Sequence, residues 1–249
     1  MGHPLFVLVA SIGLLSGSAW AGASISRKRP PANGEWREDF GVVLAATLTL
    51  LGLIIGFSFS MAISRYDQRK NFEEAEANAI GTEYLRADLL PAADAAQTRA
   101  LLKRYIDQRV LFYVTRDERQ LRQIRTQTDQ LQTALWRAVK APASAQPSPV
   151  VALAVAGMND VLNAQGYTQA AWWNRIPIAA WGLMGLIAVF CNVMIGYGAR
   201  TFESISVVSL VLPIVLSIAF FLIADIDSPR GGIIHVVPQN LLSLAESVR

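Results

Sequence analysis

Two groups of carboxylates are the residues of this sequence that offer chemistry most directly. Glu73, Glu74 and Glu76 follow one apolar run, and Asp225 and Asp227 close another. On a helix, Glu73 and Glu76 would share a face, because residues three apart are neighbours on the helix surface. Carboxylates gathered in this way can concentrate cations or repel anions at the mouth of a pore. Both groups are therefore candidate ion-binding sites.

Each group also has a structural interpretation, which the sequence leaves open. The three glutamates can form a solvated helix face paired with Arg69 and Lys70. The two aspartates can cap a helix or pair with arginines, because a carboxylate at the end of a membrane span costs much less than one at mid-bilayer, where the cost is about 2.5–3.5 kcal/mol. The arginines near the ends of the apolar runs are Arg65, Arg175 and Arg230.

A few polar side chains lie within the apolar runs themselves. They are Ser58, Ser60, Asn192, Ser209 and Ser217. Their hydroxyl and amide groups can coordinate an anion in a pore, and they can equally hydrogen-bond to a neighbouring helix. Of these, Ser58, Ser60 and Asn192 are candidate pore-lining residues.

The sequence does not predict an enzyme, a metal site or a cofactor. It contains no Gly-rich phosphate loop, HExxH, GxSxG or paired-cysteine motif. The single cysteine, Cys191, lies in an apolar run, and the two histidines, His3 and His235, stand near opposite ends of the chain. A net charge of +3 without a basic cluster gives no support to nucleic-acid binding.

Four charge-free stretches dominate the chain and must position these residues. Of the 249 residues, 53% are hydrophobic and 16% are charged, against about 25% charged in soluble domains. A bilayer core about 30 Å thick requires a spanning helix of roughly 20 apolar residues. The stretches that meet this length are Pro4–Ile25, Phe40–Ile63, Ile176–Ala199 and Ile205–Ala224. We therefore predict an all-α polytopic membrane protein with four transmembrane helices.

The first stretch has an alternative interpretation as a cleaved signal peptide. Ala19-Trp20-Ala21 is similar to a signal-peptidase site. The residues before the stretch carry no Lys or Arg, however, and the basic cluster Arg27-Lys28-Arg29 follows it. This arrangement favours a retained membrane span.

The segment between the second and third spans is polar and predicted to be helical. Apolar positions at helical spacing indicate helices, and Pro, Ser and Ala in Ala141–Pro149 indicate a loop. The expected helices are Arg65–Leu90, Asp94–Val114, Asp117–Val139 and Val150–Ala171. The organisation we predict is a first helix pair (residues 1–63), a helical extramembrane domain (64–175), a second helix pair (176–227) and a C-terminal tail (228–249).

Spans two and three are expected to continue into the long helices of this domain, and Trp172, Trp173 and Trp181 to form an interfacial belt. The membrane orientation of the domain stays open. Basic residues flank both ends of the spans, with Arg27, Lys28, Arg29 and Arg37 at one end and Arg65, Arg69, Lys70, Arg175 and Arg230 at the other.

Small residues recur at four-residue spacing within three of the spans. The predicted stripes are Gly13, Gly17 and Ala21; Gly52, Gly56 and Ser60; and Ala188, Asn192 and Gly196. Small residues let membrane helices approach closely. The stripes therefore indicate either packing within one bundle or packing between subunits around a pore.

Several segments resemble the bacterial bestrophin-like domain family. They are Glu74–Arg86, Asp88–Pro91, Leu101–Arg109 and Phe221–Asp227, with Pro229 and Gly232–Ile234. The layout of four spans with a helical segment between the second and third is also similar to that family, and the resemblance covers nearly the whole chain.

The resemblance implies a function. Bestrophins are pentameric anion channels with helical cytosolic parts, so it implies an oligomeric ion channel for chloride or other small inorganic anions. It further implies a homo-oligomer, with a pentamer as the expected state, in the lipid bilayer of a bacterial inner membrane. Phe57, Ser58, Phe59 and Ser60 of the second span would then line the pore. The chain departs from the family in its acidic residues after the fourth span, so the calcium gating of bestrophins is not expected.

A second hypothesis is a membrane scaffold or sensor that conducts nothing and binds a partner through its helical domain. The scarcity of polar residues in the spans favours it. A closed apolar bundle would support this alternative, whereas polar residues converging on an axis would support the channel.

Overall fold

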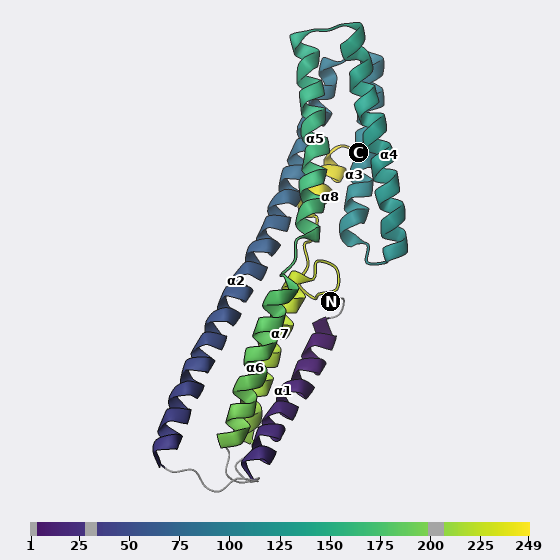
Figure 1. Ribbon diagram of the computed structural model, residues 1–249. Coiled ribbons are helices and arrows are strands. Elements are labelled where there is room, and N and C mark those ends of the chain that lie inside the picture. The colour runs from purple at the N-terminus through teal and green to yellow at the C-terminus, as the bar shows by residue number, and fades with distance from the viewer. Residues whose placement is uncertain (1–3, 28–33, 199–206) are drawn as a thin grey trace. The chain divides into compact units, whose positions relative to one another are not determined.

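The computed structural model describes residues 4–27, 34–198 and 207–249, and all regular secondary structure in these ranges is helical. The chain divides into two compact units (Figure 1). We call Met1–Arg65 with Arg175–His235 the membrane unit, and Tyr66–Asn174 with Val236–Arg249 the helical unit. Some residues named in the sequence predictions lie outside the described residues, namely Lys28, Arg29, Ala199 and Ile205. The side chains of Arg37 and Ser209 are also outside the description.

The membrane unit contains the four predicted spans. They are α1 (Pro4–Ser26), the first part of α2 (Gly34–Arg86), α6 (Ile178–Gly198) and α7 (Val207–Asp227). Each belongs to a helical stretch that is long and apolar enough to cross a membrane. The prediction of an all-α protein with four transmembrane helices is confirmed. Helix α2 also continues from its apolar part to Arg86 without a break, as expected.

Helix α1 packs directly against α6 through glycine residues. A Cβ atom on Gly196 would overlap the carbonyl oxygen of Ala19, and one on Gly22 would overlap that of Val193. Since neither position has room for any side chain, the two backbones touch, as small residues permit in membrane helices. Helix α1 is thus a packed member of the membrane unit.

The small-residue stripes do not all serve this packing. Ala188, Asn192 and Gly196 are buried, which agrees with packing inside one bundle. In α1 the stripe makes no close contact within one chain, because a Cβ on Gly13 or Gly17 would meet nothing within 4 Å, so packing of this stripe between subunits stays a prediction. The buried face of α1 consists of Pro4, Ser11, Leu15, Ser18, Ala19, Gly22 and Ala23. Small residues occur on several sides of this helix, so their four-residue spacing did not identify the contact face.

Helices α5 (Pro149–Trp173) and α6 are separate, contrary to the expectation that span three continues into the preceding helix. Residues 174–177 between them are not helical. Pro177 explains the break, since proline has no N–H to donate and disfavours helical geometry in the residue before it. The N–H of that residue, Ile176, donates instead to Asp227.

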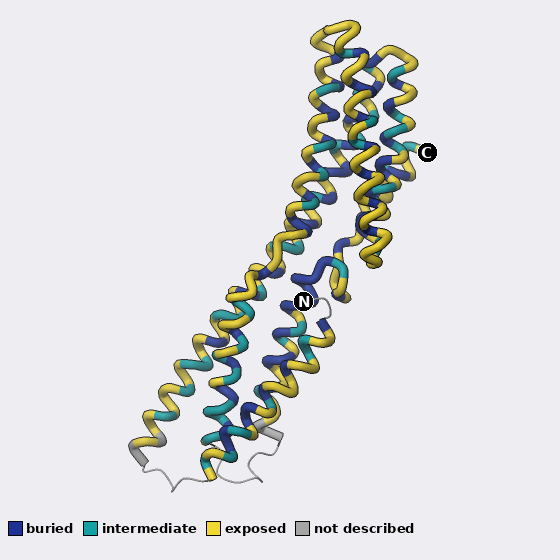
Figure 2. The backbone as a smooth tube through the Cα atoms, turned by 45° about the vertical axis from the view of Figure 1, so that its right-hand side comes forward, coloured by how far each residue is buried: buried dark blue, intermediate teal, exposed yellow. Residues whose placement is uncertain are grey.

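The helical unit is built from the rest of α2, the short 3-10 helix η1 (Ala87–Leu89), α3 (Ala92–Val114), α4 (Glu118–Ala145), α5 and α8 (Gln239–Ser247). Its apolar core includes Leu102 and Ile106 of α3, Leu135 of α4 and Met158 of α5. Figure 2 shows this burial along the inward sides of the helices. Asp117 caps α4 by accepting from the N–H of Arg119, in line with the predicted start of that helix.

Three features of the helical unit differ from the predictions. The loop expected at Ala141–Pro149 is largely helical, because α4 runs to Ala145 with Pro142 in its last turns. A proline there removes one backbone hydrogen bond, and the neighbouring alanines favour the helix. Helix α8 was not predicted at all. Trp172 is buried against Phe112 and Tyr113 in the core, so it belongs to no interfacial belt.

The α1–α6 contact predicts a position-specific effect of side-chain size. Gly196→Val should destabilise the membrane unit by about 1–3 kcal/mol, the usual cost of overpacking, because the carbonyl of Ala19 cannot rotate away. We expect a lower thermal unfolding midpoint in detergent. Gly185→Val on the same helix is the control, since a Cβ there meets nothing within 4 Å. Equal losses in both variants would contradict the proposed contact.

Candidate functional site

Charged residues occupy the buried side of α2 in the helical unit. Positions alternately four and three residues apart are buried there and into the start of η1, namely Arg69, Glu73, Glu76, Ile80, Glu83 and Ala87. This spacing keeps one helix face toward its neighbours. Four of the six positions carry a charged residue type, although burying a charge is costly unless it is paired. We call this set the acidic seam, since three of its members are glutamates.

Glu76 lies at the centre of the acidic seam and binds two other helices. Its carboxylate accepts from Nε and Nη2 of Arg109 on α3 and, at 3.0 Å, from Oγ1 of Thr168 on α5. Burial alone would lower the pKa of Arg109, but the Glu76 carboxylate, together with Tyr105 and Tyr113, outweighs this and raises it. The same burial and the same carboxylate raise the pKa of Tyr113. Glu76 and Arg109 thus form a buried ion pair.

Glu73 binds the C-terminal helix. Its carboxylate accepts from the backbone N–H of Leu241 at 2.9 Å and from Nδ2 of Asn240 at 2.7 Å. Both donors lie in the first turn of α8, where unpaired N–H groups and the helix dipole favour a negative charge. Glu74, by contrast, is exposed. The three glutamates singled out in the sequence therefore have three different environments.

Asp225 and Asp227 organise the end of α7 in the membrane unit. Asp225 accepts from the backbone N–H groups of Ile233 at 2.7 Å and Ile234 at 2.8 Å. Asp227 accepts from the N–H of Ile176, and one of its oxygens lies 3.6 Å from Nη1 of Arg65. The structural interpretation, capping and pairing with arginine, describes both contacts. Asp227 thereby joins the end of α7 to Arg65, which follows the apolar part of α2, and to the segment before α6.

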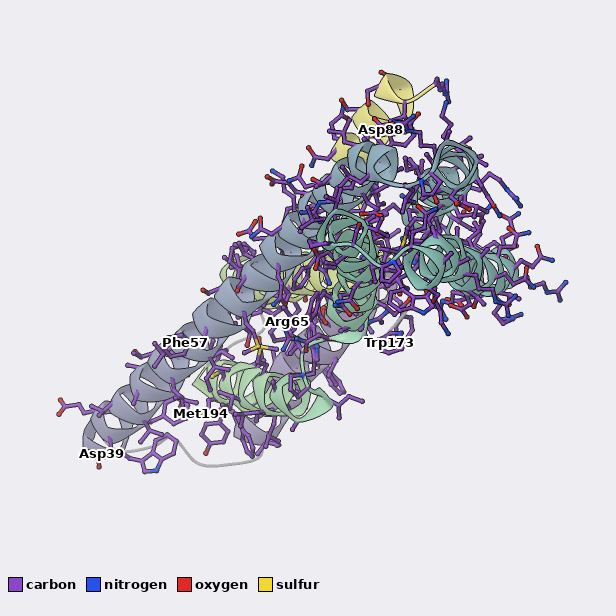
Figure 3. All side chains as sticks on the ribbon, turned by 90° about the horizontal axis from the view of Figure 1, so that it is seen from above. Asp39, Phe57, Arg65, Asp88, Trp173 and Met194 are labelled. Carbon is purple, nitrogen blue, oxygen red and sulfur yellow. The ribbon has the colours of Figure 1, made fainter. Side chains whose placement is uncertain are left out.

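The pore-lining candidates are placed on different sides of their helices. Ser58 and Asn192 are buried within the chain, and Asn192 donates to the carbonyl oxygen of Ala188 on its own helix. Phe59 is half-buried, whereas Phe57 and Ser60 are exposed. Figure 3 shows that Phe57 lies on α2 between Asp39 and Arg65.

The apolar part of α2 has one contact face and one open face. Leu51, Ser58 and Ala62 are buried. With 3.6 residues per turn, Gly56 and Ser60 lie on the opposite side, and both are exposed. A Cβ on Gly52 or Gly56 would meet nothing within 4 Å. The predicted stripe of small residues on this span therefore makes no close contact through its glycines within one chain.

Sequence reasoning did not identify Arg109, Thr168 or Glu83. Arg109 is 33 residues from its partner Glu76, a separation that no local pattern connects. Glu83 could have been found, because the four-and-three spacing from Arg69 to Ala87 places it on the same face as Glu76. In the ranges that the structure describes, no three His, Cys, Asp or Glu side chains gather as a metal site would require.

The ion pair of Glu76 predicts a large loss of stability on neutralisation. Glu76→Gln leaves the charge of Arg109 buried without its counterion, which typically costs about 3–5 kcal/mol. The thermal unfolding midpoint in detergent should fall accordingly. Glu74→Gln, an exposed position on the same helix, serves as the control and should unfold close to the wild type. A stable Glu76→Gln protein would show that the pair is dispensable.

Comparisons with known proteins agree with this architecture. Among curated proteins none matches the chain, but solved structures do. A bestrophin homologue from Klebsiella pneumoniae is 15% identical with a TM-score of 0.65, over 97% of this chain and 98% of that one. A tryptophan-to-alanine variant of a bestrophin homologue from the same organism gives 13% and 0.68, over 100% and 96%. At these identities the likeness shows the fold.

The family follows from the sequence as a whole. The model of the bestrophin-like domain matches residues 6–241, which include all four spans and nearly all of the helical unit. The resemblance seen in the separate motifs thus extends along almost the entire length. The chain belongs to the bestrophin-like family.

Proposed function

We propose that this chain is a subunit of an oligomeric anion channel in which α2 faces the pore. The observation that carries the proposal is the open face of α2. Only 6% of the residues in its most apolar window are buried, against 50% in α7. The corresponding share is 28% in α1 and 22% in the stretch that includes α6, so α2 has the least covered apolar surface of the four spans.

Small and hydroxyl-bearing residues on that face favour another protein copy or water over lipid, beside the exposed apolar side chains of Val42 and Leu53 on the same side. Gly52, Gly56 and Ser60 are exposed there, with Thr49 also exposed along the same side. Small residues gain little from contact with lipid tails but let helices pack closely. Hydroxyl groups can also replace part of the hydration shell of an ion. We infer that copies of α2 surround a common axis, with Phe57 and Ser60 near it.

The environments of the acidic candidates support anions rather than cations. A cation pore is typically lined by rings of carboxylates. Glu73, Glu76, Asp225 and Asp227 are each engaged with backbone N–H groups or cationic side chains of the same chain. Of the carboxylate candidates, Glu74 alone is exposed. The family relationship points to anions as well, with a pentamer in a bacterial inner membrane as the expected assembly.

A flux measurement tests the channel. Purified protein in liposomes should release chloride faster than protein-free liposomes, and faster than it releases potassium. Absence of flux for both ions would favour the scaffold or sensor hypothesis. Mass determination in mild detergent provides a second test, since a monomer would leave the open face of α2 without a partner and would contradict the proposal.

Cysteine labelling tests the orientation of α2. Cys191 is buried and is the only cysteine of the sequence, so Cys191→Ala gives a suitable background. Gly56→Cys and Ser60→Cys should react with a water-soluble methanethiosulfonate, and the reaction should reduce chloride flux. Phe190→Cys on α6 is the control, because that side chain is 56% exposed and would face lipid. Labelling of the control alone would refute the proposed lining.

A further inference from the structure

Glu83 is a buried carboxyl group for which the packing supplies no hydrogen-bond partner. Its exposed fraction is 0%, and neither carboxyl oxygen has a partner within the described part of the chain. The other two glutamates of the acidic seam, Glu73 and Glu76, each accept two or more hydrogen bonds. A buried ionised carboxylate without partners is costly, and such a group is expected to take up a proton.

The backbone of α5 leaves space for the side chain of Glu83. On α5, a Cβ atom at Gly157 would overlap Oε2 of Glu83 and would lie 2.6 Å from Nη1 of Arg86. Any residue other than glycine at this position would displace one of the two groups. The carboxyl group and the guanidinium group therefore both rest against the bare backbone of α5.

Arg86 lies between two acidic residues, Asp160 and Glu83. Its Nη1 lies 3.9 Å from Oδ2 of Asp160 on α5, and this contact crosses from one helix to the other. Glu83 belongs to the same helix as Arg86, three residues earlier, at a spacing that permits an ion pair. The guanidinium can pair across to α5 or within α2.

We propose that Glu83 is a proton-binding site that decides which partner Arg86 takes. With the proton bound, Glu83 is neutral and Arg86 pairs with Asp160 on α5. When the proton passes to water, the buried carboxylate attracts Arg86, and the cross-helix pair is lost. Glycine at position 157 leaves the space that this exchange requires.

The electrostatic environment agrees with this assignment. Burial raises the pKa of Glu83 to about 8, while Arg86 lowers it and Asp160 raises it. On the adjacent elements, Asp88 of η1 and Arg99 of α3 form an ion pair with each other. Glu83 thus titrates near neutral pH, between the charges of Arg86 and Asp160.

The direction in which folding stability changes with pH follows from the pKa of Glu83 in the folded and the unfolded chain. In the unfolded chain the pKa of Glu83 has its ordinary value of 4.5. Between pH 4.5 and about 8, the folded protein keeps a proton that the unfolded chain has released. Stability therefore falls as the pH rises through this window, and it levels off above the folded-state pKa.

The test is the thermal unfolding midpoint of the full chain in detergent, measured from pH 5 to pH 9. Glu83→Gln mimics the protonated group, so its midpoint should match that of the wild type near pH 5. At pH 9 it should exceed the wild-type midpoint by about 5 °C or more, given the usual conversion of stability into temperature. Glu74→Gln, the exposed control, should follow the wild type at every pH. Identical pH profiles for wild type and Glu83→Gln would overturn the proposal.

Asp160→Asn provides an independent readout should Glu83→Gln fail to fold. Removing this carboxylate lowers the pKa of Glu83, so the fall in stability should shift to lower pH. An unshifted profile would contradict a role for Asp160 beside Glu83.

The regulatory consequence rests on the proposed channel function. Chloride flux of the wild type should differ between pH 6.5 and pH 9, and Glu83→Gln should remove the difference. A wild-type chloride flux that does not change with pH would show that the protonation of Glu83 does not control conduction. Absence of any flux would count against the channel alone, because the unfolding profiles measure the proton site by themselves.

Discussion

The cost of burying charge on α2 determines how the helical unit is assembled. A carboxylate removed from water must find a cation or several N–H groups, and a partner that is absent costs several kcal/mol. Glu76 meets this demand with Arg109 of α3 and Thr168 of α5. Glu73 meets it with the first turn of α8. These bonds form only in one register, whereas the apolar contacts of Leu102 or Met158 would tolerate small shifts.

In the membrane unit, buried carboxylates accept hydrogen bonds mainly from backbone N–H groups. Asp225 and Asp227 stand at the end of α7, where the chain leaves its apolar run, and their oxygens accept from three main-chain N–H groups. Near the C-terminal ends of α1 and α6 the contacts are between bare backbones, at Gly22 and Gly196. Carboxylates at the end of α7 and close glycine packing between α1 and α6 together contribute to the arrangement of α1, α6 and α7.

The sequence predicted those features that follow from local chemistry. A charge-free run of about 20 residues has few alternatives to a spanning helix, which is why all four spans were found. The polar continuation of α2 was also visible, since it contains no proline before Pro91. Features that depend on distant partners were not accessible. Whether Glu76 was a solvated residue or a buried ion depended on Arg109, and helix α8 is short and packs against α2 near Gly81. Pro142 and Pro177 had opposite effects on their helices, because the first removes a single bond late in α4 and the second stands at the start of α6.

The chain passes between its two units at three points, and these differ in stiffness. One passage lies inside α2, between Arg65 and Tyr66, where the helix is continuous. The other two, next to Arg175 and Val236, lie in non-helical segments. A helix transmits rotation about its axis and translation along it, whereas an extended segment absorbs both through its free dihedral angles. Of the three passages, only the one inside α2 therefore has its backbone dihedral angles fixed by a continuous series of helical hydrogen bonds.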